Sequence, residues 1–236
     1  MKKALAFFAL LLGVLYVLKT VSRSRTWQFA GEIVPRVETS RKVVALSFDD
    51  GPEAEPVSEI LQALGSVKAT FFVCGAGMAA NPGVAEKLVA GGHELGNHSF
   101  THQRMWLKTR SFIADEIERT DALIRAAGHA GAIHFRAPYC KKLVALPRYL
   151  DETGRIQVTW DVEPESVPEI DADAALITAH VLERVRPGSI VLLHPWYRNR
   201  NRTRQAIPAI VEGLRARGYE FVTVSELLAL RQRQGN

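Results

Sequence analysis

The stretch VVALSFDDGP, residues 43–52, says most about how this chain folds. Its first six residues form an almost unbroken apolar run, which is typical of a strand covered on both faces. Gly51 and Pro52 are turn residues, so we expect the strand to end at the pair Asp49 and Asp50. Polar side chains at the carboxyl end of a strand lie where α/β barrels build their active sites. Taken alone, the pair is also compatible with an acidic surface turn.

Short apolar runs alternate with helical stretches along the rest of the chain. The predicted strands are Val43–Phe48, Ala69–Val73, His93–Gly96, Ile133–Arg136, Ile156–Trp160, Ser189–Leu193 and Glu220–Val224. The predicted helices are Pro56–Leu64, Pro82–Ala90, Thr109–Ala127, Ala172–Val185 and Thr203–Arg217. Such alternation implies parallel strands joined by right-handed helical crossovers. We therefore expect an α/β fold, either a barrel with about seven parallel strands or an open doubly wound sheet.

The N-terminus has the layout of a secretory signal or a signal anchor. Lys2 and Lys3 precede an apolar run from Ala4 to Leu18, and Lys19 follows it. A helix of this length reaches about 22 Å, short of the roughly 30 Å hydrocarbon core, although flanking lysines can snorkel. The run lacks a clear cleavage site, which favours an uncleaved anchor over a signal peptide. We expect residues 1–21 to be this segment, 22–40 a linker and 41–236 one folded domain outside the cytoplasm.

Composition narrows the class of protein further. The formal net charge is +5, but the basic residues are scattered and no basic–aromatic motif supports nucleic-acid binding. The two cysteines, Cys74 and Cys140, stand far apart without a CxxC pattern. This spacing excludes a cysteine-based zinc site.

Two histidines, His98 and His102, stand four residues apart in the motif NHSFTH, residues 97–102. At this spacing they would face the same side of a helical turn, which suits one metal ion. Histidine is the commonest metal ligand, and aspartate is a common third one. Together with the aspartate pair at residues 49–50, they make a two-histidine, one-aspartate site the leading hypothesis. Three protein ligands leave a position open for water, which is typical of a catalytic site.

Three further motifs place polar side chains near predicted strand ends. FRAPY, residues 135–139, contains Arg136, which can orient a carboxylate and favour its charged form. WDVEP, residues 160–164, contains Asp161. LLHP, residues 192–195, contains His194, a candidate general acid. Trp196, directly after it, can either stack on a sugar ring or pack in the core.

The five motifs, in this order and at these spacings, resemble those of the polysaccharide deacetylases of the nodulation-protein-B type, carbohydrate esterase family four. The similarity runs from about Val43 to Leu228 and covers nearly the whole domain. It implies a single-domain α/β fold, a distorted (β/α) barrel with about seven parallel strands, in agreement with the strand count. Residues 41–236 would then be a polysaccharide deacetylase catalytic domain.

The resemblance also implies roles for five residues of the first three motifs. Asp50, His98 and His102 would bind one divalent metal ion, usually zinc. Asp49 would act as the general base, and Arg136 would keep it ionised.

The remaining roles concern proton donation and substrate contact. His194 would be the general acid, and Asp161 would tune it. The backbone N–H of Tyr139 would help to bind the oxyanion, and Tyr139 and Trp196 are the expected substrate-binding residues.

The activity expected from the resemblance is the hydrolysis of acetyl groups, above all N-acetyl groups of a peptidoglycan- or chitin-like polysaccharide, with release of acetate. The alternatives are an O-acetyl xylan or glycan esterase and a non-catalytic carbohydrate-binding protein on the same fold. Gln103, Cys140 and Pro195 differ from the residues usual in the family, which leaves the choice of polysaccharide open. The expected partners are an acetylated polysaccharide and, through the N-terminal segment, a membrane. We expect a monomer in the cell envelope, anchored or secreted.

Overall fold

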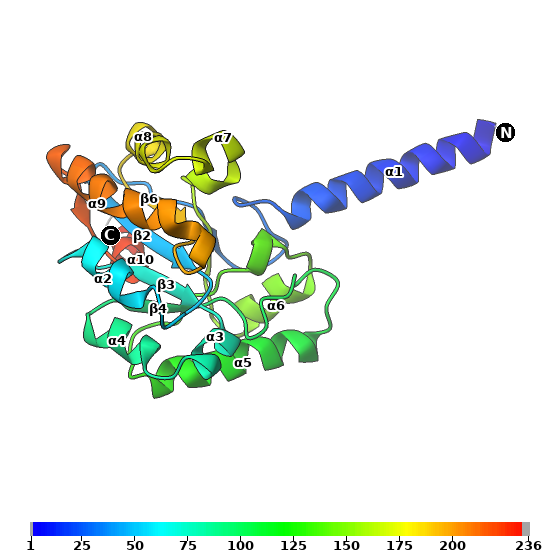
Figure 1. Ribbon diagram of the computed structural model, residues 1–236. Helices are drawn as coiled ribbons and strands as arrows, with labels where there is room; N and C mark the ends of the chain where they lie inside the picture. The colour runs from blue at the N-terminus through cyan, green and yellow to red at the C-terminus, as the bar shows by residue number, and fades with distance from the viewer. Residues whose placement is uncertain (1, 233–236) are drawn as a thin grey trace.

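The computed structural model describes residues 2–232. Met1 of the predicted N-terminal segment and residues 233–236 of the predicted domain lie outside the described residues. Parallel strands form the centre of the molecule and helices cover them (Figure 1). The strands are β1 (Ile33–Val34), β2 (Val43–Asp49), β3 (Thr70–Val73), β4 (Glu94–Asn97), β5 (Gln157–Val158), β6 (Ser189–Leu193) and β7 (Glu220–Phe221).

The strands close into a distorted barrel, as expected. The sheet runs in the order β4-β3-β2-β6, with β7 beside the start of β2 and β1 beside β5. Single-residue bridges join Phe135 to both Asn97 and Gln157, and a further bridge joins Val162 to Val191 of β6. These bridges carry the sheet from β4 past β5 and back to β6.

Six of the predicted strands are present, and the one predicted at Ile133–Arg136 is reduced to the bridge at Phe135. Pro138 lacks an N–H and restricts the residue before it, so the chain turns away after only one paired residue.

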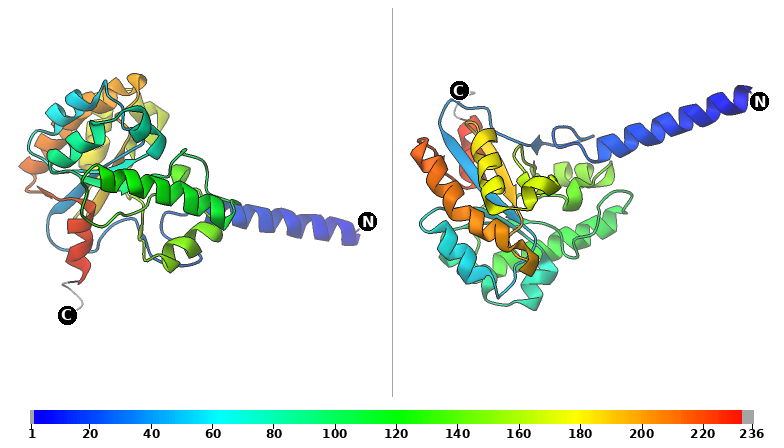
Figure 2. Two further views of the ribbon diagram at one scale, coloured as in Figure 1. Left: turned by 90° about the horizontal axis from the view of Figure 1, so that it is seen from below. Right: turned by 45° about the horizontal axis from the view of Figure 1, so that its top comes forward.

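Helices surround the strands on the outside (Figures 1 and 2). They are α2 (Val57–Leu64), α3 (Gly75–Ala80), α4 (Val84–Ala90), α5 (Arg110–Ala126), α6 (Ala145–Glu152), α7 (Pro168–Asp171), α8 (Ala174–Arg184), α9 (Asn201–Ala216) and α10 (Val224–Gln232), with short 3-10 turns η1 (Pro138–Cys140), η2 (Pro164–Ser166) and η3 (Arg198–Arg200). Asp173 caps α8 through its side chain, and Thr109 caps α5. The helices α3, α6, α7 and α10 were not expected from the sequence.

The alternation of side chains along β2 places the polar residues of the site. All seven residues of β2 are buried, which explains its apolar sequence. Val44 and Leu46 pack between the sheet and the outer helices. Ala45 points to the other face, into the barrel interior. Because side chains on one face recur every second residue, Ser47 and then Asp49 follow Ala45 along this interior face.

Helix α10 covers the opposite end of the barrel. The backbone N–H of Val224 donates to the Thr70 hydroxyl, and that of Ser225 donates to the Glu94 carboxylate. Thr70 and Glu94 are the first residues of β3 and β4. Leu227 is fully buried in the interior cluster. This end of the barrel is therefore closed by α10.

The N-terminal helix α1 (Lys2–Ser22) projects away from the barrel in every view (Figures 1 and 2). Its large apolar side chains are exposed, Leu5 and Phe7 among them. Among residues 2–232, no helix combines the length and hydropathy needed to cross a membrane.

Residues 22–40, expected to be an irregular linker, belong to the folded unit over most of their length. β1 pairs with β5, and Val34 and Val37 are buried. The expectation of an irregular linker is therefore wrong, because a two-residue strand leaves no periodic signal in the sequence.

Candidate active site and metal centre

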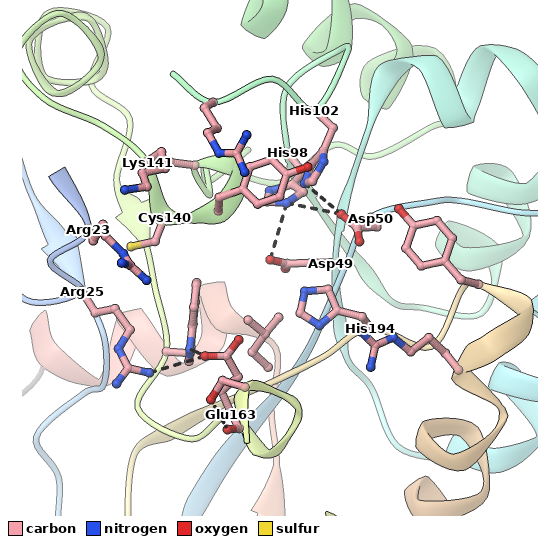
Figure 3. Close-up of a pocket in the computed structure, with 18 residues that line it drawn as sticks. Arg23, Arg25, Asp49, Asp50, His98, His102, Cys140, Lys141, Glu163 and His194 are labelled. Atoms are coloured by element: carbon pink, nitrogen blue, oxygen red, sulfur yellow. Dashed lines mark hydrogen bonds and ion pairs between the residues drawn. The ribbon is translucent and has the colours of Figure 1, made fainter. Parts of the chain in front are cut away.

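A cleft of about 730 Å³ opens at the carboxyl ends of the strands (Figure 3). Most of the residues that the sequence singled out lie in it, although they come from distant parts of the chain. The lining includes Asp49, Asp50, His98, His102, Tyr139 and His194. Three of the predicted residues, Arg136, Asp161 and Trp196, do not line it.

Asp50, His98 and His102 bring three ligand atoms together in this cleft. The Oδ1 atom of Asp50 lies 3.1 Å from Nε2 of His102 and 3.6 Å from Nε2 of His98. One ligand atom from each residue lies within 4.8 Å of the others. Ligand atoms about 2.1 Å from a tetrahedral zinc ion would be about 3.4 Å apart, so these separations match those of a metal site.

Three further observations fit a divalent cation. Nδ1 of His98 lies 2.8 Å from the backbone oxygen of Arg136, so that nitrogen carries the proton and Nε2 presents its lone pair to the cluster. Burial, with a smaller contribution from His102, lowers the pKa of His98 to about 3, which keeps the ring neutral as a ligand must be. Oδ1 of Asp50 is buried without a hydrogen-bond partner. A cation would satisfy this orphaned acceptor.

The two histidines do not share a helical turn, and that part of the prediction is wrong. Residues 98–102 form an irregular loop after β4, in which Ser99 (φ 68°) and His102 (φ 56°) have left-handed backbone conformations. The loop still brings the two imidazole rings to 4.9 Å between centroids.

Glu116 of α5 holds this loop in place. Its carboxylate is buried and accepts hydrogen bonds from the backbone N–H groups of Phe100 and Thr101 and from the Thr101 hydroxyl. The role of Glu116 could not be predicted from the sequence, because a glutamate within a helix has no local feature that shows it supports a distant loop.

Asp49 lies beside the three candidate metal ligands and is paired with Arg136. Nη1 of Arg136 donates to Oδ1 of Asp49 at 2.5 Å, while Oδ2 of Asp49 lies 3.6 Å from Nε2 of His98. Arg136 is completely buried, donates to the backbone oxygens of Val158 and Thr159, and lies over the ring of Phe72. These contacts orient one carboxylate oxygen and leave the other facing the cleft.

His194 follows β6 and is paired with Glu165 of η2, not with Asp161. Nδ1 of His194 lies 2.6 Å from Oε2 of Glu165, and the backbone N–H of His194 donates to the same oxygen. Burial by itself would lower the pKa of His194, but the hydrogen bond and charge of Glu165, with smaller contributions from Asp49 and Asp50, raise it to about 9.

The expectation that Asp161 tunes His194 is therefore wrong. Asp161 accepts hydrogen bonds from the Ser189 hydroxyl and the Ile190 backbone N–H, at the start of β6. Glu165 lies four residues further along the chain, and no local pattern distinguishes it from Glu163 or Asp161.

The aromatic residues divide between the cleft and the core. Tyr139 is 52% exposed, has a left-handed backbone (φ 56°), and stacks beside His102 with 4.7 Å between the ring centroids. Trp196 is only 1% exposed and packs against Gly51 and Phe71. The expectation that Trp196 binds substrate is wrong, whereas its neighbour Tyr197 lines the cleft.

Comparison with known proteins identifies the family of the chain. The sequence model of the family described as polysaccharide deacetylase matches residues 36–158. A chitooligosaccharide deacetylase of Sinorhizobium fredii is 39% identical over 166 residues, which make up 68% of this chain and 75% of that protein. A peptidoglycan-N-acetylglucosamine deacetylase of Listeria monocytogenes is 31% identical over 82% of this chain. The chain belongs to the polysaccharide deacetylase family.

Solved structures extend the similarity to three dimensions. The Bc1960 peptidoglycan N-acetylglucosamine deacetylase superposes with a TM-score of 0.76 at 26% identity, over 82% of this chain and 91% of that one. A pseudoenzyme of carbohydrate esterase family four from Bacillus anthracis, BA3943, superposes with a TM-score of 0.74 at 27% identity, over 85% of this chain and 69% of that one. The chain spans 40% of the length of the Listeria protein and 31% of a bifunctional xylanase/deacetylase of Pseudobutyrivibrio xylanivorans.

Proposed function

We propose that this protein is a metal-dependent hydrolase that removes N-acetyl groups from amino sugars of an envelope polysaccharide and releases acetate. The observation that carries the proposal is the convergence of Asp49, the ligand set Asp50–His98–His102 and His194 in one cleft. Relatives named as peptidoglycan and chitooligosaccharide deacetylases support the same class of substrate.

The proposed cofactor is one divalent metal ion, zinc in the first instance. Nitrogen ligands from two histidines and one carboxylate oxygen are a donor set that zinc accepts. When bound, the ion would supply Lewis-acid polarisation of the acetyl carbonyl and a lowered pKa for water.

The protein's own residues would move the protons. Asp49 is the proposed base, because its Oδ2 faces the cleft while the ion pair with Arg136 holds its Oδ1. The backbone N–H of Tyr139, at the mouth beside His102, is the proposed donor to the oxyanion of the tetrahedral intermediate.

His194 is the proposed acid. An amine leaves only with a proton, since an amide anion is a very poor leaving group. A pKa of about 9 keeps the ring protonated at neutral pH, and Glu165 holds Nδ1 so that Nε2 is free to donate toward the cleft. The sugar oxygen of an O-acetyl ester is a better leaving group than a deprotonated amine. Loss of the acid should therefore matter less for an O-acetyl substrate.

The N-terminal helix suggests where the protein works. α1 begins at Lys2, has Lys19 in its last turn, and exposes its apolar side chains. We propose that it directs the chain out of the cytoplasm as a signal anchor or a signal peptide, which would place the cleft among envelope polysaccharides.

The test is acetate release by zinc-loaded protein from chitotetraose, from peptidoglycan fragments and from acetylated xylan. We expect release from the amino-sugar substrates, loss on chelation and recovery with zinc. The variant Asp49→Asn should keep its zinc in elemental analysis and lose acetate release. Full activity in that variant would remove Asp49 as the base, and release from xylan alone would favour the esterase.

A further inference from the structure

The segment that follows α1 forms one wall of the catalytic cleft. The backbone oxygen of Ser22 accepts a hydrogen bond from the Lys142 backbone N–H at 3.0 Å, and that of Arg25 accepts one from the Thr159 hydroxyl at 2.7 Å. Ser22 is completely buried, and the ammonium of Lys142 donates to the backbone oxygen of Ser24. The backbone of residues 22–25 is thus attached at several points, which fixes the positions from which the side chains of this segment extend.

Attachment of this segment places cations in the cleft. Arg23 and Arg25 line it together with Arg104 and Lys141. Figure 3 shows Arg23, Arg25 and Lys141 gathered on one side, with His194 on the opposite side. Arg104 is held against the ring of Tyr139, with its guanidinium carbon 4.3 Å from the ring centroid.

These cations are poorly neutralised by the protein itself. Within residues 2–232, no acidic group lies within 4.0 Å of Arg23, Arg104 or Lys141, and Arg25 has only Glu163, at 3.8 Å. Glu163 also accepts a hydrogen bond from the indole of the tryptophan at position 160.

The cations also repel one another. Partial burial, followed by the charges of Arg23, Lys19 and Arg104, lowers the pKa of Lys141. A group of like charges kept close together and without counter-charges is a place where an anion binds favourably.

We propose that Arg23, Arg25, Arg104 and Lys141 form an anion subsite that selects acetylated sugars carrying a carboxylate or phosphate close to the acetyl group. This inference rests on the proposed deacetylase function and specifies its substrate class. Arginine guanidinium groups bind both anions through paired hydrogen bonds. Because the cations line the same cleft as Asp49 and the metal ligands, they face the substrate that reaches those groups.

The test compares anionic and neutral saccharides that are otherwise alike. The carboxylate pair is a tetramer of alternating N-acetylglucosamine and N-acetylmuramic acid against chitotetraose. The phosphate pair is N-acetylglucosamine 1-phosphate against N-acetylglucosamine. Dissociation constants are measured by calorimetry in zinc-loaded Asp49→Asn protein, in which turnover is suppressed, so binding is read independently of activity.

In that background, Arg23→Gln and Arg25→Gln should each weaken binding of an anionic saccharide about 3- to 5-fold and the double variant about 10-fold. Binding of the neutral partners should change less than about 2-fold, and added salt should weaken only anionic binding. The saccharide pair whose anion-to-neutral binding ratio falls in the arginine variants identifies the anion as carboxylate or phosphate. Arg41→Gln is the charge-matched control, because Arg41 precedes β2 and is exposed beside Glu220, at the other end of the barrel.

Unchanged anion-to-neutral ratios in Arg23→Gln, Arg25→Gln and a further variant, Lys141→Gln, would overturn the subsite. Thermal unfolding checks that each variant is folded, and Lys141→Gln serves if substitution in the N-terminal segment impairs folding. If the arginine variants instead lose affinity only for phosphatidylglycerol vesicles, the cations serve a membrane surface and the proposal is wrong. Acetate release by wild-type protein from chitotetraose tests the deacetylase function separately.

Discussion

The contact between Glu165 and His194 leads to a quantitative prediction about pH dependence. Glu165→Gln removes the negative charge but keeps a side chain able to hydrogen-bond the ring, so the geometry should survive. With the charge gone, the pKa of His194 should fall from about 9 to near its ordinary value of about 6.5. The general acid works in its protonated form, so activity is retained below this pKa and lost as the pH rises through it.

The size of the effect follows from these two pKa values. At pH 8, about nine-tenths of the wild-type rings would be protonated, against about 3% in the variant, which is roughly a 30-fold loss. At pH 6, the two proteins should differ by less than about 2-fold. Burial of the ring, which also lowers its pKa, would make the loss at pH 8 larger.

The assay is kcat for acetate release from chitotetraose between pH 5.5 and pH 10 (about 0.5-unit steps), together with an activated acetyl ester whose leaving group needs no proton. In Glu165→Gln, the alkaline limb of the pH profile should shift for the amide substrate only. Asp161→Asn is the matched control, since Asp161 contacts Ser189 and Ile190 rather than His194. A basic limb at the same pH in wild type and Glu165→Gln, or one shifted by Asp161→Asn, would refute the assignment of Glu165.

Three further predictions concern the loop of residues 98–102 and the turn after β2. Glu116→Gln should weaken zinc binding about 10- to 100-fold by loosening the loop around Thr101, as measured by competition with a chelator; an unchanged affinity would show that the loop holds itself. His98→Ala should abolish stoichiometric zinc in elemental analysis while the protein still unfolds cooperatively, and retained zinc would contradict its role as a ligand. Gly51→Ala should destabilise the fold by about 2–4 kcal/mol in denaturant unfolding, because its φ is +61° and a Cβ would meet a buried indole at 2.6 Å. Gly154→Ala, with φ +65° and open space around it, should cost only about 1 kcal/mol, so equal losses would rule out the steric explanation.

Local sequence patterns predicted much of the fold and part of the candidate site. The strand Ser189–Leu193 was predicted with its observed bounds, because a fully buried strand needs an unbroken apolar run. Asp173 caps α8, and the left-handed Gly128 and Gly218 follow helix ends, since caps depend on nearby backbone groups. The grouping of His98 with Asp50 also followed from motif order, although the helical turn invoked for the histidines is absent.

The errors share a cause. Asp161 and Glu165 are both acidic residues after β5, and only the path of the chain through η2 brings Glu165 to His194. Trp196 and Tyr197 are adjacent aromatic residues, and burial against neighbouring elements put the first in the core and the second in the cleft.

The sequence alone determined which segments are buried strands, where helices are capped, and which residue types are available for chemistry at the strand ends. These properties depend on neighbours within a few positions, where periodicity and hydrogen bonding act. Only the tertiary structure decided that Arg23 and Arg25 reach the cleft, that Glu116 supports the loop of residues 98–102, and that Glu165 is the partner of His194. Those pairings depend on how the barrel closes. Distances between segments far apart in the chain cannot be predicted from the local sequence.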